Sequence, residues 1–62
     1  MKFIKVTDVK FELETPVWIN VDRILSINDT RSGGIIAFSN AENDYIYTKE
    51  TAEDILTQLL NS

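Results

Sequence analysis

Side chains that could do acid–base chemistry are few in this 62-residue chain. Cysteine and histidine are absent, so the chain has no thiol nucleophile and lacks the usual general base and the commonest metal ligand. The carboxylates that lie closest in sequence are Glu50, Glu53 and Asp54. Acid–base catalysis needs two carboxyl groups in one cleft with divergent pKa values. These three instead fit a solvated helix face near an N-terminus, where the helix dipole favours negative charge. We therefore predict no catalytic residue and no enzyme.

Two polar segments resemble binding loops, but neither has the residue order that binding requires. Residues 40–44 (Asn-Ala-Glu-Asn-Asp) offer oxygen ligands without the spacing or the final glutamate of a calcium loop. Residues 31–34 (Arg-Ser-Gly-Gly) lack the lysine of a phosphate loop, and an apolar strand-like segment follows them where that motif needs a helix. We interpret both as turns and predict no metal and no cofactor.

The aromatic residues Trp18, Tyr45 and Tyr47 form the candidate interaction surface. Amphipathic aromatic side chains are enriched at protein contacts. If the aliphatic neighbours of Trp18 and the intervening Ile46 face the core, alternation turns all three aromatic rings outward. In the alternative interpretation, the rings fill the second side of a small barrel or pack under a helix.

Most of the chain has the alternating, β-branched and aromatic pattern of short strands. Strands are expected at residues 2–7, 9–14, 17–21, 24–27, 35–39 and 45–48. Within 9–14, Val9, Phe11 and Leu13 are expected to share one face of a half-buried strand or of an extended hairpin arm. Thr15-Pro16 is expected to interrupt the extended structure. A tight bend is predicted at 20–23, and the strongest loop signal, which includes both glycines, spans 28–34.

The period then changes to that of a helix over about 50–61. Apolar residues recur at i, i+3, i+4, i+7 and i+8, starting from Ala52. Thr48 or Thr51 is the expected N-cap.

The sequence therefore predicts a single domain over 1–62, of α+β (mainly β) class. Its architecture is a small antiparallel β-meander or an SH3-like partial barrel, with four to six strands within 2–48 and one C-terminal helix. The predicted core consists of Ile4, Val6, Ile19, Ile24, Ile27, Ile36, Phe38, Ile46, Ile55, Leu56 and Leu59.

Charge is unevenly distributed along the chain. Residues 1–31 sum to zero, and residues 32–62 carry the entire net charge of −4. An acidic chain repels phosphate backbones and anionic lipid, so we expect no direct nucleic-acid or membrane binding. Neither an export signal nor cysteine is evident, which fits a cytoplasmic location. Lys2, Lys5 and Lys10 are expected either to guard an open strand edge or to rim an oligomer contact.

Three segments carry a resemblance to a known family: residues 1–7 (MKFIKVT), 19–27 (INVDRILSI) and 48–56 (TKETAEDIL). Together they resemble the small bacterial FlbD/SwrD-like proteins, which are flagellar and swarming accessory proteins. Where flagellar members carry a glycine in the turn after the central hairpin strand, this chain has no glycine after residues 34–40. The resemblance implies a small cytoplasmic accessory protein without catalytic residues.

Two functions follow as hypotheses. The first is a non-enzymatic interaction module that acts through an aromatic or edge-strand surface and self-associates, because a small core without disulfides gains stability from a partner. The alternative is an acidic regulator, such as a phage-type inhibitor, that mimics nucleic-acid charge and blocks a basic protein site.

Overall fold

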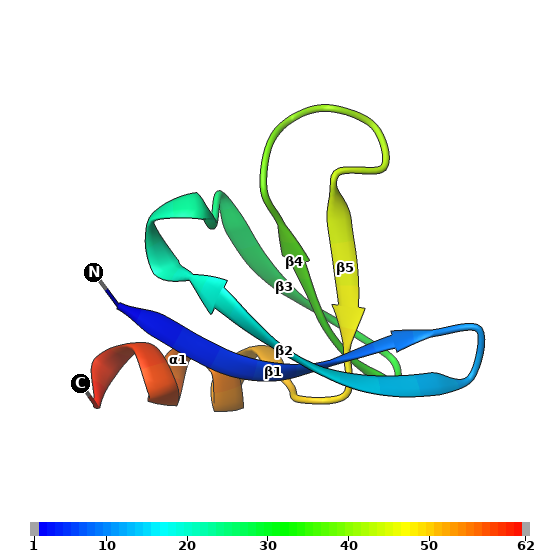
Figure 1. Cartoon of the computed structure of the whole chain (residues 1–62), viewed down its shortest axis with the longest axis horizontal. Coiled ribbons are helices and arrows are strands. Elements are labelled where there is room, and N and C mark those ends of the chain that lie inside the picture. Colours follow the sequence, from blue (N-terminus) through cyan, green and yellow to red (C-terminus); the bar gives the residue numbers. More distant parts are fainter. Residues whose placement is uncertain (1, 62) are drawn as a thin grey trace.

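The computed structural model describes residues 2–61, which form five β-strands followed by one α-helix. The elements are β1 (Phe3–Lys10), β2 (Leu13–Asn20), the 3-10 helix η1 (Val21–Arg23), β3 (Ser26–Thr30), β4 (Gly33–Ala37), β5 (Tyr45–Thr48) and α1 (Ala52–Leu60). The strands form one sheet in the order β2-β1-β5-β4-β3, and all neighbours are antiparallel (Figure 1). The predicted mainly β fold class with a C-terminal helix is confirmed. Met1 and Ser62, the ends of the predicted domain, lie outside the described residues.

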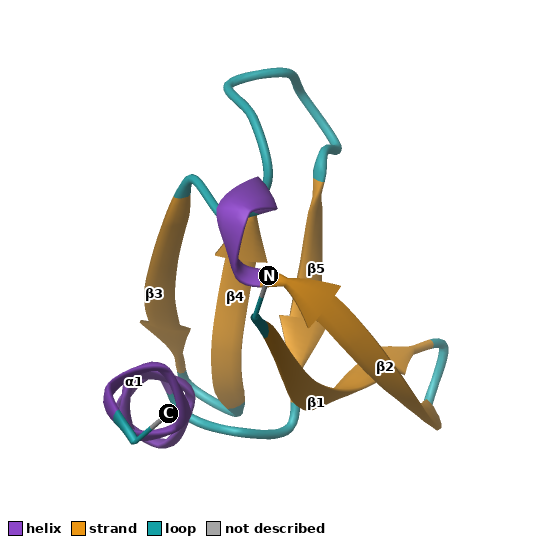
Figure 2. Cartoon of the chain, turned by 60° about the vertical axis from the view of Figure 1, so that its left-hand side comes forward, coloured by secondary structure: helices purple, strands orange, loops and turns teal. Residues whose placement is uncertain are grey.

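The core lies where the β1–β2 hairpin and α1 pack against one face of β3-β4-β5 (Figure 2). Five aliphatic side chains are buried there: Ile4, Val6, Ile19, Ile36 and Ile55. A partly buried shell packs against them: Val17, Val21, Ile24, Ile27, Phe38, Ile46 and Leu59. All but one of the predicted core residues therefore lie in or against the core. Leu56 was wrongly placed there, because 47% of its surface is exposed.

The chain reverses at Phe11 and Glu12, where alternation predicted a continuous strand. Both residues have positive φ angles, 52° and 65°, as a two-residue type I′ turn requires. Neither is the glycine, asparagine or aspartate that such turns prefer, so the paired strands on either side impose the reversal. The expected half-buried face was wrong, since Phe11 and Leu13 are 86% and 68% exposed.

β2 continues through Pro16, so the predicted interruption at Thr15-Pro16 was wrong. Proline is tolerated because β2 is an edge strand of the sheet. Hydrogen-bonded and non-bonded pairs alternate from the hairpin turn, so Pro16, opposite Thr7, directs its nitrogen away from β1. The proline thus removes a donor from the free edge. Lys5 and Lys10 lie on β1, which pairs with β2 along its length and with β5 only at Asp8↔Thr48.

The two glycines lie in β4, although residues 28–34 were predicted to form a loop. Strands β3 and β4 extend into this segment and leave a turn of two residues between them. A Cβ on Gly33 would lie 2.1 Å from the carbonyl oxygen of Thr48, and one on Gly34 would lie 2.8 Å from that of Glu50. The glycines therefore permit a close approach of two backbone segments. The predicted bend after Asn20 and the turn at residues 40–44 are present.

Helix α1 begins and ends within the predicted range. Thr51 is its N-cap, with a side chain that accepts a hydrogen bond from the Asp54 N–H. The helix packs through Ile55, which is fully buried, and through the half-buried Gln58. Turning Gln58 toward β1 leaves Leu56 on the outer side, which explains its exposure. No helix in residues 2–61 has the length and apolar character needed to cross a membrane.

Candidate interaction surface

The face of β3-β4-β5 opposite the core carries no charged side chain on its strands. Ile27, Ile36 and Ile46 pair across the three strands and pack toward the core, so the residues on either side of them face outward. Two cross-strand rows result, Ser26–Ala37–Tyr45 and Asn28–Ile35–Tyr47. In a chain with 26% charged residues, an uncharged sheet face is a distinctive surface.

The tyrosines are the most prominent side chains of this outer face. Tyr45 and Tyr47 are 39% and 48% exposed, and their rings meet edge to face with centroids 5.4 Å apart. The pKa of Tyr45 lies above its ordinary value. The causes are, in order, the side-chain hydrogen bond to Tyr47, the electrostatic influence of Tyr47, burial and the carboxylate of Glu42. The Tyr45 phenol is therefore neutral at physiological pH. Each tyrosine presents an apolar ring with a polar edge.

Trp18 lies on the outward side of β2, apart from the tyrosine pair. It is 66% exposed, and Lys5 Nζ lies 5.8 Å from its ring centroid. It lines an open cleft of about 470 Å³ together with Ile19, Asn20, Arg23, Phe38, Ser39 and Asp44. Among residues 2–61, the one aromatic ring contact is that between the tyrosines, which does not include Trp18. The three predicted surface residues are thus all exposed, but they form two patches.

A second depression, which we call the β1–β5 hollow, separates the ends of two neighbouring strands. β1 and β5 pair at Asp8↔Thr48 and then diverge. The hollow has a volume of about 300 Å³ and is lined by Asp8, Val9, Lys10, Asn43, Tyr45, Ile46 and Tyr47. Its apolar wall combines Ile46 with the two tyrosine rings, and its charged side comes from β1.

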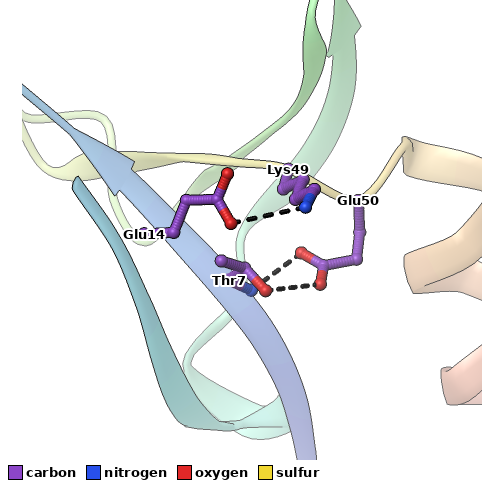
Figure 3. A network of polar contacts seen from close by, with 4 residues as sticks. All are labelled: Thr7, Glu14, Lys49 and Glu50. Atoms are coloured by element: carbon purple, nitrogen blue, oxygen red, sulfur yellow. Dashed lines mark hydrogen bonds and ion pairs between the residues drawn. The ribbon is translucent and has the colours of Figure 1, made fainter. Parts of the chain in front are cut away.

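Glu50 has a structural role that the sequence did not reveal. It precedes α1, and its Oε1 and Oε2 accept hydrogen bonds from the Thr7 N–H (2.7 Å) and the Thr7 hydroxyl (2.9 Å), as Figure 3 shows. Its predicted place on a solvated helix face was therefore wrong. Burial tends to raise the pKa of Glu50, but the hydrogen bonds from Thr7 and the charge of Lys49 outweigh it and lower the pKa. Lys49 Nζ also pairs with Glu14 Oε1 at 3.3 Å on the exposed side.

Gln58 makes a similar contact with β1, at Lys5, two residues before Thr7. Its Oε1 accepts a hydrogen bond from the Lys5 N–H at 3.1 Å, and its Nε2 donates to the Lys5 carbonyl at 2.8 Å. Side chains from the helical segment therefore occupy backbone groups of β1 that a neighbouring strand would otherwise bind. Gln58 stands outside the apolar repeat of the helix, so periodicity did not indicate this contact.

The remaining acidic residues do not assemble into a site. Glu42 and Asp44 precede β5, whereas Glu53 and Asp54 follow it on α1. Asp44 Oδ2 accepts a hydrogen bond from the Ser39 hydroxyl at 2.5 Å. Within the described range 2–61, no group of three or more acidic, histidine or cysteine side chains is arranged to hold a metal ion.

Comparison of the chain with protein-family models, with curated proteins and with solved structures finds no match. The resemblance to the FlbD/SwrD-like proteins therefore stays a prediction from short sequence patterns, and the geometry of the surface is the basis for a functional proposal.

Proposed function

We propose that this chain is a small non-enzymatic accessory protein that binds another protein chain through exposed aromatic side chains. The observation that supports this most directly is the uncharged outer face of β3-β4-β5, which carries Tyr45 and Tyr47 along β5. Side chains of this kind bury a large apolar area at low entropic cost and still satisfy a polar atom at the edge of a contact. Trp18 supplies a second aromatic patch on β2.

The balance of buried and exposed apolar residues also favours a binding role. Within residues 2–61, five hydrophobic residues are buried, whereas nine large ones are exposed. The exposed set is Phe3, Phe11, Leu13, Trp18, Leu25, Tyr45, Tyr47, Leu56 and Leu60. Single exposed apolar residues are ordinary, but grouped ones mark contact sites. A partner that covers them would add to the limited core of so short a chain.

Side chains, and not strand pairing, are the proposed means of binding. Pro16 removes a donor from the free edge of β2, and Glu50 and Gln58 occupy backbone groups along β1. An added strand could therefore not form a continuous ladder of backbone hydrogen bonds along β1 or β2. At β1 and β2, this favours the aromatic version of the sequence-based hypothesis over the edge-strand version. β3, the other edge strand of the sheet, carries no proline.

The proposal includes a cytoplasmic location and no direct contact with nucleic acid or membrane. The net charge of −4 and the absence of cysteine support it. The acidic-regulator hypothesis predicts a basic partner that is released by salt, because screening weakens contacts between exposed charges.

The test compares capture of partners by immobilised wild-type chain and by variants at low and high salt. We expect a partner that is retained at high salt and lost when Tyr45→Ser and Tyr47→Ser are combined. Leu60→Ser is the matched control, since Leu60 is 84% exposed on α1 and away from both aromatic patches. Circular dichroism checks that each variant is folded. A partner held equally by all aromatic variants, including Trp18→Ser, would refute the proposal, and a basic partner released by salt would favour the acidic regulator.

A further inference from the structure

Phe11, at the tip of the β1–β2 hairpin, is unusual both in its backbone conformation and in the exposure of its side chain. Phe11 has a φ of 52°, a left-handed conformation that is rare for bulky residues. The same side chain is 86% exposed, and the contact made by its ring is with Lys10, whose Nζ lies 5.7 Å from the ring centroid. Asparagine or glycine would form the same turn with less strain. Strand pairing holds the reversal in place, but the exposed Phe11 ring adds no packing that would offset the strain. This points to a role for Phe11 outside its own fold.

The tip projects beyond β5 (Figure 1). The β1–β5 hollow is lined by Val9 and Lys10, which directly precede the tip, whereas Phe11 does not line it and is 86% exposed. Its volume of about 300 Å³ is at the small end of the range for ligand pockets, a size suited to one aromatic side chain. The exposed Phe11 ring thus directly follows the β1 residues that line the hollow.

We propose that two copies of this chain associate through a two-fold axis, and that each inserts Phe11 into the β1–β5 hollow of the other. This inference deepens the proposed interaction function and rests on it, because it names a second copy as the binding partner. A two-fold contact requires that Phe11 and the hollow belong to one surface, and Phe11 directly follows Val9 and Lys10, which line the hollow.

Charge complementarity favours a second copy as the occupant. The tip carries Lys10 and Glu12 on either side of Phe11, and the hollow carries Asp8 and Lys10 on its charged side. When the tip of one copy enters the hollow of the other, Lys10 meets Asp8 of the second copy and Glu12 meets Lys10 of the second copy. Both contacts join opposite charges and occur twice in the dimer, although each chain has a net charge of −4.

The decisive variant is Phe11→Asn, measured by sedimentation equilibrium together with thermal unfolding of the dilute monomer. We expect the wild-type chain to dimerise and the variant to dimerise roughly thirtyfold more weakly, as for loss of one interface hot spot. We expect the melting temperature of the dilute monomer to be unchanged or higher, because asparagine relieves the strain at this φ. A structural role for Phe11 would instead lower both dimerisation and melting temperature. Leu60→Asn, on the far side of the chain, is the control that leaves dimerisation unchanged.

A mixing experiment tests the charge contacts directly. In a dimer of Glu12→Lys, the new lysine faces Lys10 of the second copy. In a dimer of Lys10→Glu, the new carboxylate faces Asp8 and Glu12 of the second copy. Each variant alone should therefore dimerise more weakly at low salt. In an equimolar mixture, the lysine-rich tip of one variant meets the acidic hollow of the other. The mixture should therefore associate more tightly than either variant alone. Absence of this rescue would refute the proposed geometry.

The outcomes separate this inference from the function on which it rests. A wild-type chain that stays monomeric at millimolar concentration, or a Phe11→Asn variant that dimerises like the wild type, overturns the dimer. Capture of a different partner that depends on Tyr45 and Tyr47, by a monomeric chain, would leave the proposed interaction function standing. Dimerisation that depends on Phe11, without any captured partner, supports the inference and limits the function to self-association.

Discussion

β1 and the turn that follows it differ in how their backbone is stabilised. Along β1, Glu50 and Gln58 bind the backbone groups of Thr7 and Lys5 that no strand pairs with. In the turn, Phe11 takes a strained conformation and exposes its ring. The first region has the contacts expected of selection for stability, whereas the second gives up stability that a simple substitution would restore. The contrast indicates that folding accounts for the contacts of Glu50 and Gln58 with β1, and that binding is needed to account for Phe11.

The largest effect on stability is expected from Gly34→Ala, which disturbs the segment around Glu50. The new Cβ would lie 2.8 Å from the Glu50 carbonyl oxygen, 2.9 Å from Thr48 Oγ1 and 3.3 Å from Ile55 Cδ1. Backbone at that distance has to move, and this shifts the segment that carries the Glu50 cap. We expect a loss of about 3 kcal/mol in the free energy of unfolding, measured by urea denaturation. A loss below about 0.5 kcal/mol would show that the two backbone segments are not held together.

Glu50→Gln should have the next largest effect and should also change the pH dependence. The amide keeps one acceptor but loses the charge that strengthens both bonds from Thr7, so we expect a loss of about 1.5 kcal/mol at pH 7. Since the folded-state pKa of Glu50 lies below its ordinary value of 4.5, its contribution is present above pH 4.5 and is lost as the pH falls through the folded-state pKa.

Urea denaturation of both proteins between pH 7 and pH 3 tests this prediction. The stability difference between wild type and Glu50→Gln should shrink as the solution is acidified below pH 4.5. Glu53→Gln is the control, because Glu53 lies exposed on α1 and makes no side-chain contact with β1 among the described residues. A difference that stays constant with pH would rule out the charged form of Glu50 as the stabilising species.

Gln58→Ala should be milder than the change at Glu50. It removes two neutral hydrogen bonds to Lys5, but these backbone groups are exposed and water replaces the amide. We expect a loss of about 1 kcal/mol, which lowers the melting temperature by about 4–8 °C in a domain of this size. Amide hydrogen exchange should speed up at Lys5 more than at Val6, whose N–H pairs with β2. Equal changes at both positions would mean that the strand opens as a unit.

The smallest effect is expected from Glu14→Gln, which breaks the ion pair with Lys49. Both side chains are more than half exposed, so screening by water limits the contribution to about 0.5 kcal/mol or less. The change lies near the tip without touching Phe11, so self-association should be unaffected. A loss above about 1 kcal/mol would show that the hairpin arm depends on this pair.

Helix α1 shows how much of the fold could be predicted from local signals. Its range and the Thr51 cap depend on residues within one or two turns, and both predictions are confirmed. The apolar repeat is buried only in part, since Leu56 and Leu60 are exposed. Trp18, Tyr45 and Tyr47 were likewise named as outward candidates from alternation alone, and all three are exposed. The sequence could not show that Trp18 lies apart from the tyrosine pair, because that depends on how β2 packs relative to β5.

The misplaced segments share one cause. Phe11 and Glu12 have no turn propensity, Pro16 looks like a break, and Gly33 and Gly34 look like a loop. In each case a contact with another segment determines the structure. Eight cross-strand pairs impose the reversal at the hairpin turn, and the edge position of β2 tolerates proline. The chain that follows β5 passes so close to β4 that only glycine fits there. These contacts join residues far apart in sequence, which periodicity does not encode.

The sequence by itself determined the mainly β character, the helix with its cap and the residues of the buried core, because these depend on apolar periodicity and on local hydrogen bonding. The tertiary structure alone decided which backbone groups of β1 are capped by Glu50 and Gln58, which strand forms the free edge, and that Phe11 stands exposed directly after the β1 residues that line the β1–β5 hollow. The physical reason is that hydrogen bonds and packing between distant segments outweigh the weak local preferences of single residues.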